Sequence, residues 1–353
     1  MALRPTRYGE APARVLVIGG GRAGVEALVA LHGLASERVA LELITPEPAI
    51  ESGAAACGHR RAMKRSLGDV TRHTGTRLVS GSLAAVDTAR RKVTLVSGEI
   101  RPYDRLLVTV GAHAEESIAG ALTFGAPGGA ARFRKMLLLA QTGEINDVVF
   151  AVPALIGLPL GIYDLTLRTA ARLRTASTSA SLQLTLITPE HAPLADFGPA
   201  TSAAALDALE AHGIHVVTGL TPEEIVWGAL RARPANVRIN ADIVITLPRM
   251  RGPAVHGLAA DERGFVVVDN YGLVGGSTDV YAAGDATTMF PIKDAGLAAQ
   301  QALGVAETIA ASVGVPLAPR PFHPVLHGIL PGIGESCDSV AVGVAGNRVR
   351  PGW

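Results

Sequence analysis

The chain has 353 residues, of which 48% are hydrophobic, and a formal net charge of +1. This is enough for two or three domains with their own cores, and the small net charge gives no indication of nucleic-acid binding. The two cysteines, Cys57 and Cys337, form neither a disulfide framework nor a zinc pattern, and no apolar run reaches the ~18 residues of a transmembrane helix, so we expect a cytoplasmic protein.

A short apolar strand, a glycine-rich turn and a helix are the first predicted elements. The strand covers residues 15–18, and glycines follow at positions 19, 21 and 24. The first glycine permits a tight bend, the second lets a pyrophosphate approach the backbone, and the third lets the helix pack on the strand. The N–H groups at the helix start favour phosphate. The candidate cofactor-binding residues here are Gly19, Gly21, Arg22, Ala23 and Gly24, and the predicted apolar helix face contains Val25, Leu28, Val29, Leu31 and Leu34.

The second predicted strand covers residues 39–45. A dinucleotide fold has an acidic residue about 20 positions after the turn, where it binds ribose hydroxyls. Glu42 lies inside this strand, so its side chain leaves by a face of the sheet. Glu47 lies just past the strand, and we therefore take Thr45 or Glu47 as the candidate ribose contact.

A seven-residue segment near the N-terminus is repeated in the middle of the chain, and we call this repeat the echo. Residues 41–47 recur as 184–190 with six of seven positions identical, which predicts two related βαβ units. The second unit begins with a strand at 147–152, and its helix is expected from about 160 to 173. Alignment sets Val152 against Gly19 and Ala154 against Gly21, while Gly157 keeps the place of Gly24.

Two of the three turn glycines are therefore missing from the second unit. A β-branched valine tolerates unusual backbone angles poorly, and the Cβ of Ala154 would stand where a pyrophosphate must approach. We expect this unit to keep its fold but to bind NAD(P)H poorly or not at all. One alternative remains open, in which nearby arginines supply phosphate contacts instead of forming a solvated helix face: Arg168, Arg172 and Arg174.

Two further segments end in turns at the tips of predicted strands. Residues 103–112 run into a turn with Thr109 and Gly111, and residues 278–285 end in Gly284 and Asp285. A carboxylate at the end of a strand can accept hydrogen bonds from a polyol. A helix is then expected from about Asp294.

Together these motifs resemble the two-dinucleotide-fold flavoproteins, which include sulfide:quinone reductases, type II NADH dehydrogenases and pyridine nucleotide-disulfide reductases. The resemblance covers roughly residues 13 to 325. It implies FAD, with the ADP half on residues 19–24, the ribityl chain on Asp285, and the adenine beside residues 80–83, including Leu83. It also implies that the N-terminus of the helix that follows Lys293 faces the flavin, with Lys293 and Gly296 as further cofactor-binding candidates.

The predicted fold class is α/β, with two Rossmann-like FAD/NAD(P)-binding domains, the second inserted in the first, and a short C-terminal segment. Residues 1–112 and 241–320 are assigned to the FAD-binding domain. Residues 113–240 are assigned to the degenerate NAD(P)-binding-like domain, and residues 321–353 to the C-terminal segment.

Catalytic candidates are few. Around residues 155–164 the chain resembles the sulfide:quinone branch, but Ile156 and Gly157 stand where that branch has a cysteine. Cys337 lacks an evident partner, and we assume no covalent link to Cys57, although relatives place its loop near the flavin. Lys293, beside a helix start, is expected to stabilise negative charge on the reduced ring; the alternative is a solvated lysine. The scattered histidines predict no metal site.

The sequence therefore predicts an FAD-dependent oxidoreductase with non-covalent flavin, which resembles sulfide:quinone reductases but lacks their paired redox cysteines. Its small-molecule donor and acceptor are unknown, and use of NAD(P)H and formation of a homo-oligomer are left open. One alternative is an NAD(P)H oxidoreductase similar to type II NADH dehydrogenases. Another, of a different class, is a flavin-holding scaffold or redox sensor that acts through a protein partner.

Overall fold

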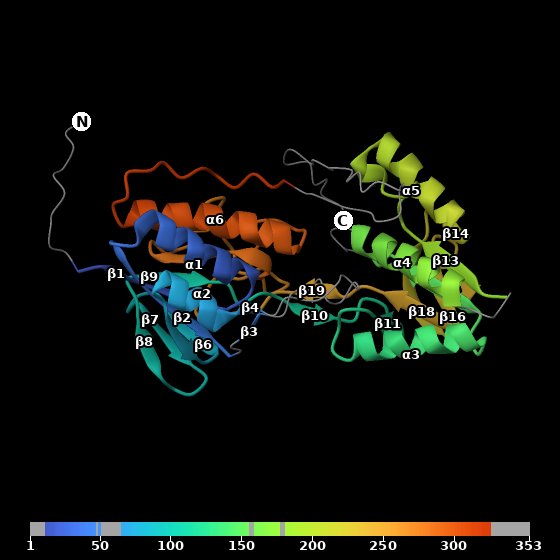
Figure 1. Cartoon of the computed structure of the whole chain (residues 1–353), viewed down its shortest axis with the longest axis horizontal. Coiled ribbons are helices and arrows are strands. Elements are labelled where there is room, and N and C mark those ends of the chain that lie inside the picture. The colour runs from blue at the N-terminus through green and yellow to red at the C-terminus, as the bar shows by residue number, and fades with distance from the viewer. Residues whose placement is uncertain (1–10, 47–48, 51–64, 155–158, 177–180, 326–353) are drawn as a thin grey trace. The chain divides into compact units, whose positions relative to one another are not determined.

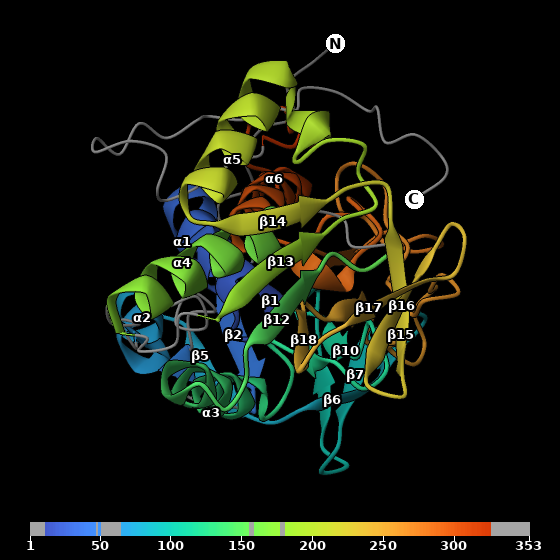
Figure 2. The same ribbon diagram turned by 90° about the vertical axis from the view of Figure 1, so that its right-hand side faces the viewer.

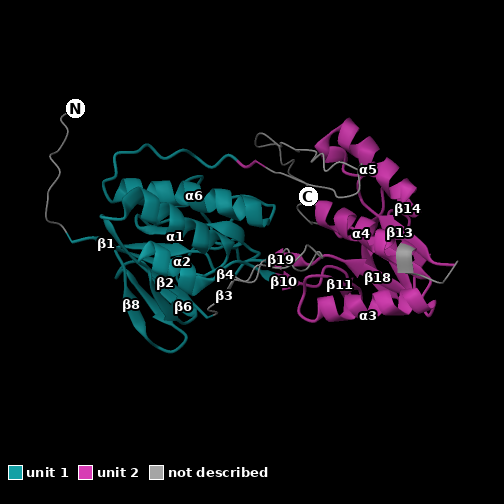
Figure 3. Cartoon of the chain, in the orientation of Figure 1, with its two compact units in different colours: residues 1–52, 61–113, 251–323 teal, residues 53–60, 114–250, 324–353 magenta. Residues whose placement is uncertain are grey.

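The computed structural model of the chain describes residues 11–46, 49–50, 65–154, 159–176 and 181–325 (Figure 1). These residues form two compact units (Figure 3). Unit 1 takes its described residues from 11–113 and 251–323, and unit 2 takes them from 114–250 and 324–325.

Unit 1 is built on a five-stranded parallel sheet in the order β20-β9-β1-β2-β5. The strands are β1 (Ala13–Ile18), β2 (Val39–Thr45), β5 (Arg77–Ser80), β9 (Arg105–Val108) and β20 (Val280–Ala282). The helices are α1 (Arg22–Ala35), α2 (Leu67–Thr74) and α6 (Ala295–Ser312), with a 3-10 turn η3 (Gly284–Ala286). The shorter strands are β3 (Ala49–Ile50), β4 (Arg65–Ser66), β6 (Leu83–Asp87), β7 (Lys92–Leu95) and β8 (Ile100–Pro102).

Successive side chains of β1 point to opposite faces of the sheet, and each face of the sheet is covered by a different layer. Val15 and Val17 pack with α1 and α6, which lie side by side in Figure 1. Leu16 and Ile18 point to the other face, where they pack with residues of the antiparallel meander β6-β7-β8. Because successive strand residues face opposite sides, one apolar strand supplies both cores.

Unit 2 repeats this plan with a parallel sheet in the order β11-β18-β12-β13-β14, the last four of which are seen side by side in Figure 2. The strands are β11 (Leu122–Thr123), β12 (Asp147–Ala151), β13 (Gln183–Ile187), β14 (Ile214–Val217) and β18 (Ile243–Thr246). The helices are α3 (Gly129–Thr142), α4 (Leu160–Ala176) and α5 (Pro199–Ala211), with a 3-10 turn η2 (Ala195–Phe197). The meander strands are β15 (Thr221–Val226), β16 (Ala229–Arg233) and β17 (Val237–Asn240), while β10 (His113–Glu115) and β19 (Arg249–Arg251) pair separately.

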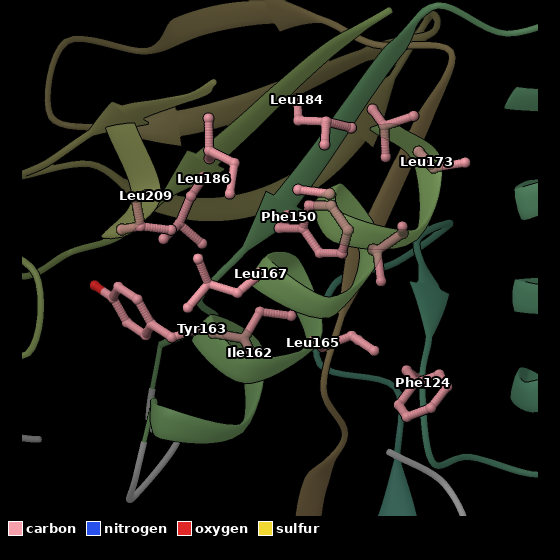
Figure 4. Packing of buried hydrophobic residues seen from close by; sticks show 14 of the residues in the cluster. Phe124, Phe150, Ile162, Tyr163, Leu165, Leu167, Leu173, Leu184, Leu186 and Leu209 are labelled. Atoms are coloured by element: carbon pink, nitrogen blue, oxygen red, sulfur yellow. The ribbon is translucent and has the colours of Figure 1, made fainter. Parts of the chain in front are cut away.

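The same alternation appears in β12. Val148 and Phe150 face the helices in the cluster of Figure 4, whereas Val149 and Ala151 face the meander β15-β16-β17. Each unit therefore has helices on one face of a parallel sheet and a meander on the other. The predicted α/β fold class with two Rossmann-like folds is confirmed.

Two details differ from the sequence prediction. The change from unit 2 back to unit 1 comes at residues 250–251 rather than at 240–241, because β18 pairs with β11 and β12 of unit 2. On α1, Val29 and Leu34 are exposed by 45% and 39%. Small residues on that helix are buried instead, namely Ala23, Gly24, Ala27 and Ala35, since α1 packs closely against α6.

Candidate functional site

The glycine turn after β1 is tightly enclosed on one side and open on the other. Gly19 has a φ of +112°, and a Cβ there would lie 2.3 Å from the carbonyl oxygen of Thr109. A Cβ on Gly24 would lie 2.0 Å from the carbonyl oxygen of Gly19. At Gly21, by contrast, a Cβ would meet no atom within 4 Å. The turn therefore presents a bare stretch of backbone at Gly21.

The start of α1 suits an anion. No side chain caps this end of the helix, and its first turn holds no acidic residue. The exposed Arg22 pairs with Glu26, 3.0 Å away, on the next turn. Uncapped N–H groups and the positive end of a helix dipole favour phosphate.

Thr109 and Thr45 support the turn from two neighbouring strands. The buried Thr109 hydroxyl donates to the carbonyl oxygens of Ile18 and Gly19, at 3.0 and 2.9 Å. Thr45 is also buried at the end of β2, and its hydroxyl would lie 3.1 Å from a Cβ on Gly20. Thr109 therefore holds the backbone of the turn, while Thr45 lies beside it.

The other residues of the sequence prediction have separate positions. Glu42 pairs with Arg101 of β8, 3.2 Å away, so it leaves by a face of the sheet and not at the tip. Leu83 begins β6 and packs in the meander core. Gly111 has a φ of +75°. Glu47 lies outside the described residues.

The second motif meets the first at the start of α1. Gly284 has a φ of +79°, and a Cβ there would lie 2.9 Å from the Cβ of Ala23. The Gly284 N–H donates to the Gln301 side chain, at 2.8 Å, which anchors the η3 turn to α6. Ala23 and Gly284, which are 261 positions apart in the chain, thus meet at one edge of the unit 1 sheet.

Asp285 follows at this edge with a partly buried carboxylate. Burial raises the pKa of Asp285, the nearby Lys293 ammonium lowers it, and Asp294 raises it. Among the residues that the structure describes, none donates a hydrogen bond to this carboxylate. It therefore keeps its capacity to accept hydrogen bonds from hydroxyl groups.

The Lys293 ammonium is directed into its own loop. It donates to the carbonyl oxygens of Thr287 and Phe290, at 2.5 and 2.9 Å, and lies 4.4 Å from the ring centroid of Phe265. Burial lowers the pKa of Lys293 to about 8, although Asp285 opposes this shift. In this arrangement the lysine fastens the loop between η3 and α6.

The start of α6 differs from that of α1. The Asp294 carboxylate caps it by accepting hydrogen bonds from the N–H groups of Gly296 and Leu297, at 2.7 and 3.2 Å. Two of the free donors that a helix start offers are thus used, and a negative charge lies beside them. This end of α6 is less suited to an anion than the start of α1.

In unit 2, the residues after β12 correspond to the glycine turn of unit 1 but differ from it in residue type and backbone conformation. The N–H of Val152 donates to the carbonyl oxygen of Ile187 at 2.8 Å, as that of Gly19 does to Ile44 at the same distance. The Thr246 hydroxyl donates to Ala151, which matches the role of Thr109. Val152 does not have the positive φ of Gly19, so the turn takes another course. Gly157 lies outside the described residues.

Sequence reasoning missed a buried carboxylate after β13. Glu190 is 7% exposed and accepts hydrogen bonds from the hydroxyls of Tyr163 and Thr188, at 2.6 and 2.8 Å. Burial raises the pKa of Glu190, while both hydrogen bonds lower it. The only signal was the echo, which places Glu190 opposite Glu47.

Cys57 and Cys337 lie outside the described residues. Within the described ranges, no group of three or more His, Cys, Asp and Glu side chains is arranged to hold a metal ion. No helix in that part of the chain has the length and apolar character needed to span a bilayer.

The residues at the carboxyl edge of the unit 1 sheet fit an adenine dinucleotide with a polyol. Bare backbone at Gly21 and an uncapped α1 fit the pyrophosphate, and the Asp285 carboxylate fits polyol hydroxyls. A ligand there lies where open α/β sheets bind their ligands, outside the carboxyl ends of the strands.

Comparisons with known proteins agree with this geometry. Residues 166–306 match the family described as pyridine nucleotide-disulphide oxidoreductase. A search of curated protein sequences finds no match.

Solved structures share the fold. The sulfide:quinone oxidoreductase from Aquifex aeolicus has a TM-score of 0.78 and 19% identity, over 92% of this chain and 85% of that one. A ferredoxin reductase from Rhodopseudomonas palustris has a TM-score of 0.66 and 17% identity, over 90% and 80%. A NAD-dependent persulfide reductase from A. fulgidus has a TM-score of 0.65 and 19% identity, over 90% and 62%.

Proposed function

We propose that this chain is a pyridine nucleotide-disulfide oxidoreductase-like FAD protein, which transfers electrons through FAD held non-covalently by unit 1. The observation that carries the proposal is the meeting of three distant motifs at one sheet edge. The Thr109 hydroxyl donates to the carbonyl oxygen of Gly19, and the backbone of Thr109 leaves no room for a side chain on Gly19. Gly284 lies against Ala23.

The residues of unit 1 have separate tasks in this proposal. Gly21 and the start of α1 bind the pyrophosphate, because the backbone is bare there and its N–H groups have no side-chain cap. Asp285 binds the ribityl hydroxyls, and Thr109 holds the turn in shape. Lys293 fixes the loop that carries Asp285 through its two carbonyl contacts. When bound, FAD supplies the two-electron chemistry that these side chains lack.

The electron donor is proposed to be a molecule other than NAD(P)H. In unit 2, Val152 replaces the glycine of the turn, and Ala154 replaces the glycine that a pyrophosphate approaches. A small thiol or sulfide donor would need no nucleotide site: two thiols would give two electrons to the flavin and leave as a disulfide, and two sulfides would leave joined by one S–S bond.

A second candidate is an NAD(P)H oxidoreductase. It is favoured by the full retention of the parallel sheet in unit 2 and by an acid, Glu190, after the second strand of that sheet. This candidate predicts that NADH reduces the bound flavin rapidly.

An anaerobic titration of the purified protein, followed by its visible spectrum, tests both candidates. The expected result is a flavin spectrum that persists in excess NADH and bleaches with sulfide or a small thiol. Rapid bleaching by NADH supports the second candidate and contradicts our choice of donor. Absence of flavin, even after FAD is added, contradicts the whole proposal.

A further inference from the structure

Glu190 lies where a dinucleotide-binding unit has its ribose-binding acid. It follows β13 by three residues, at the carboxyl edge of the unit 2 sheet. A carboxylate at this place accepts hydrogen bonds from the ribose hydroxyls in dinucleotide folds. Here, however, it is only 7% exposed, and a buried carboxylate needs donors inside the protein.

Two protein hydroxyls supply those donors. Tyr163 and Thr188 both donate to the same oxygen of Glu190, Oε2, at 2.6 and 2.8 Å. The Glu190 N–H in turn donates to the Thr188 hydroxyl at 3.3 Å, so Thr188 is bonded to both the backbone and the side chain of Glu190. A ribose would offer the same groups, two hydroxyls.

The ring of Tyr163 is firmly anchored. It is fully buried, and Figure 4 shows it beside Leu167 and Ile162, with its hydroxyl oxygen directed away from these residues. Rotation of the ring away from Glu190 would expose an aromatic side chain and leave the carboxylate with one donor fewer, so the closed contact is favoured.

The phosphate end of unit 2 has changed as well. Val152 keeps the strand hydrogen bond of its counterpart Gly19 but not its positive φ. The phosphate end of unit 2 therefore differs from that of unit 1, and the acid at its ribose end accepts hydrogen bonds from two hydroxyls of unit 2 itself.

We propose that Tyr163 and Thr188 take the place of ribose hydroxyls on Glu190, and so close unit 2 to pyridine nucleotides through its own side chains. The proposal rests on the proposed function, because only an electron-transferring chain has a donor to select. It identifies Tyr163 and Thr188 as residues that determine the class of donor.

Titration calorimetry of the FAD-loaded protein with ADP-ribose tests this closure. ADP-ribose carries the adenosine ribose and pyrophosphate but no nicotinamide, so binding is measured without flavin reduction. The wild type is expected to show no saturable binding. The Tyr163→Phe/Thr188→Val variant, whose gain comes from the ribose end alone, is expected to show saturable binding, and addition of Glu190→Gln is expected to remove this binding.

Thr169→Val is the matched control. Thr169 is buried on α4 like Tyr163, and its hydroxyl donates to the carbonyl oxygen of Leu165 without touching Glu190. This variant is expected to bind ADP-ribose no better than the wild type. If the double variant does not fold, Thr188→Val alone still removes one of the two hydroxyl donors to Glu190 and is expected to gain part of the affinity.

Saturable binding to the wild type would overturn the closure, and so would a folded double variant that gains no affinity. The flavin spectrum of the same samples reports separately on the proposed function. Loss of that function would therefore be seen as missing flavin, whereas failure of the closure would be seen only in the titration.

Discussion

Gly21 and Gly24 lie one turn apart at the start of α1, yet a side chain would meet different surroundings at each. At Gly24 a Cβ would overlap the carbonyl oxygen of Gly19, while at Gly21 it would point into open space. The fold therefore needs glycine at position 24, whereas glycine at position 21 is needed only by a ligand that approaches the backbone.

Gly24→Ala is expected to destabilise unit 1 by at least about 2 kcal/mol, because the backbone must move to make room. Gly21→Ala is expected to cost about 0.5 kcal/mol, since its φ of −73° suits alanine, and to weaken FAD binding at least tenfold. Denaturant unfolding of the apoprotein and FAD titration measure the two effects. Equal loss of stability in both variants would contradict this division of roles.

The stability of the folded protein depends on pH through Lys293. Burial lowers the pKa of Lys293 from 10.5 to about 8, so between these values the unfolded chain binds more protons than the folded one. Stability from this group therefore rises with pH across that window.

Lys293→Met removes this titration. From pH 7 to pH 10, the free energy of unfolding of the wild type is expected to rise relative to that of the variant by about 2 kcal/mol. Urea unfolding at several pH values measures the difference, in which the titration of all other groups cancels. Parallel curves for the two proteins would show that Lys293 keeps its ordinary pKa.

At the scale of elements, a threonine at the end of a central strand supports the turn in each unit. Thr109 after β9 donates to the end of β1, and Thr246 at the end of β18 donates to the end of β12. The two side chains have the same structural task, but only the turn held by Thr109 is proposed to bind a cofactor.

Thr109→Val and Thr246→Val are each expected to cost about 1 kcal/mol, because both leave a buried strand carbonyl without its hydroxyl donor. Only Thr109→Val is expected to weaken FAD binding as well, by several-fold. Unfolding experiments and FAD titration of the two variants test this. A similar effect of Thr246→Val on FAD would argue against a site confined to unit 1.

The elements that the sequence predicted are those with strong local signals. The apolar run before Gly19 and the apolar segments around the echo predicted β1, β2 and β12, and the start of α4 at Leu160. The position of β18 was less clear, because nothing in its own residues says which sheet it joins. The burial of small residues on α1 depends on the approach of α6, which is distant in the chain.

The contacts of the candidate site were less predictable than its motifs. Tyr163 and Glu190 are 27 residues apart, and no motif joins them. Lys293 was expected beside the flavin, and nothing in the sequence indicated that its ammonium also donates to two carbonyl oxygens, whose positions depend on the course of the loop. Such contacts follow from tertiary structure, so sequence patterns alone do not reveal them.

At the scale of the whole molecule, the two units are alike in topology but are proposed to differ in what they bind. FAD is therefore expected to stabilise unit 1 selectively, by about 2.7 kcal/mol at a hundredfold excess over its Kd. Hydrogen exchange should slow in β1 and β9 when FAD is added, and not in β12 and β18. NADH should slow exchange in neither pair. Protection of β12 by NADH would show a working nucleotide site in unit 2.

The pairing of β20 with β9 also bears on how the protein is made. Strand β20 follows the whole of unit 2 in the chain, so a ribosome completes residues 114–250 before the last strand of the unit 1 sheet emerges. Contacts between such distant segments form late, because a long loop must close first. During synthesis, one edge of β9 therefore stays unpaired until β20 emerges, and the proposed cofactor site is complete only after Asp285 has left the exit tunnel.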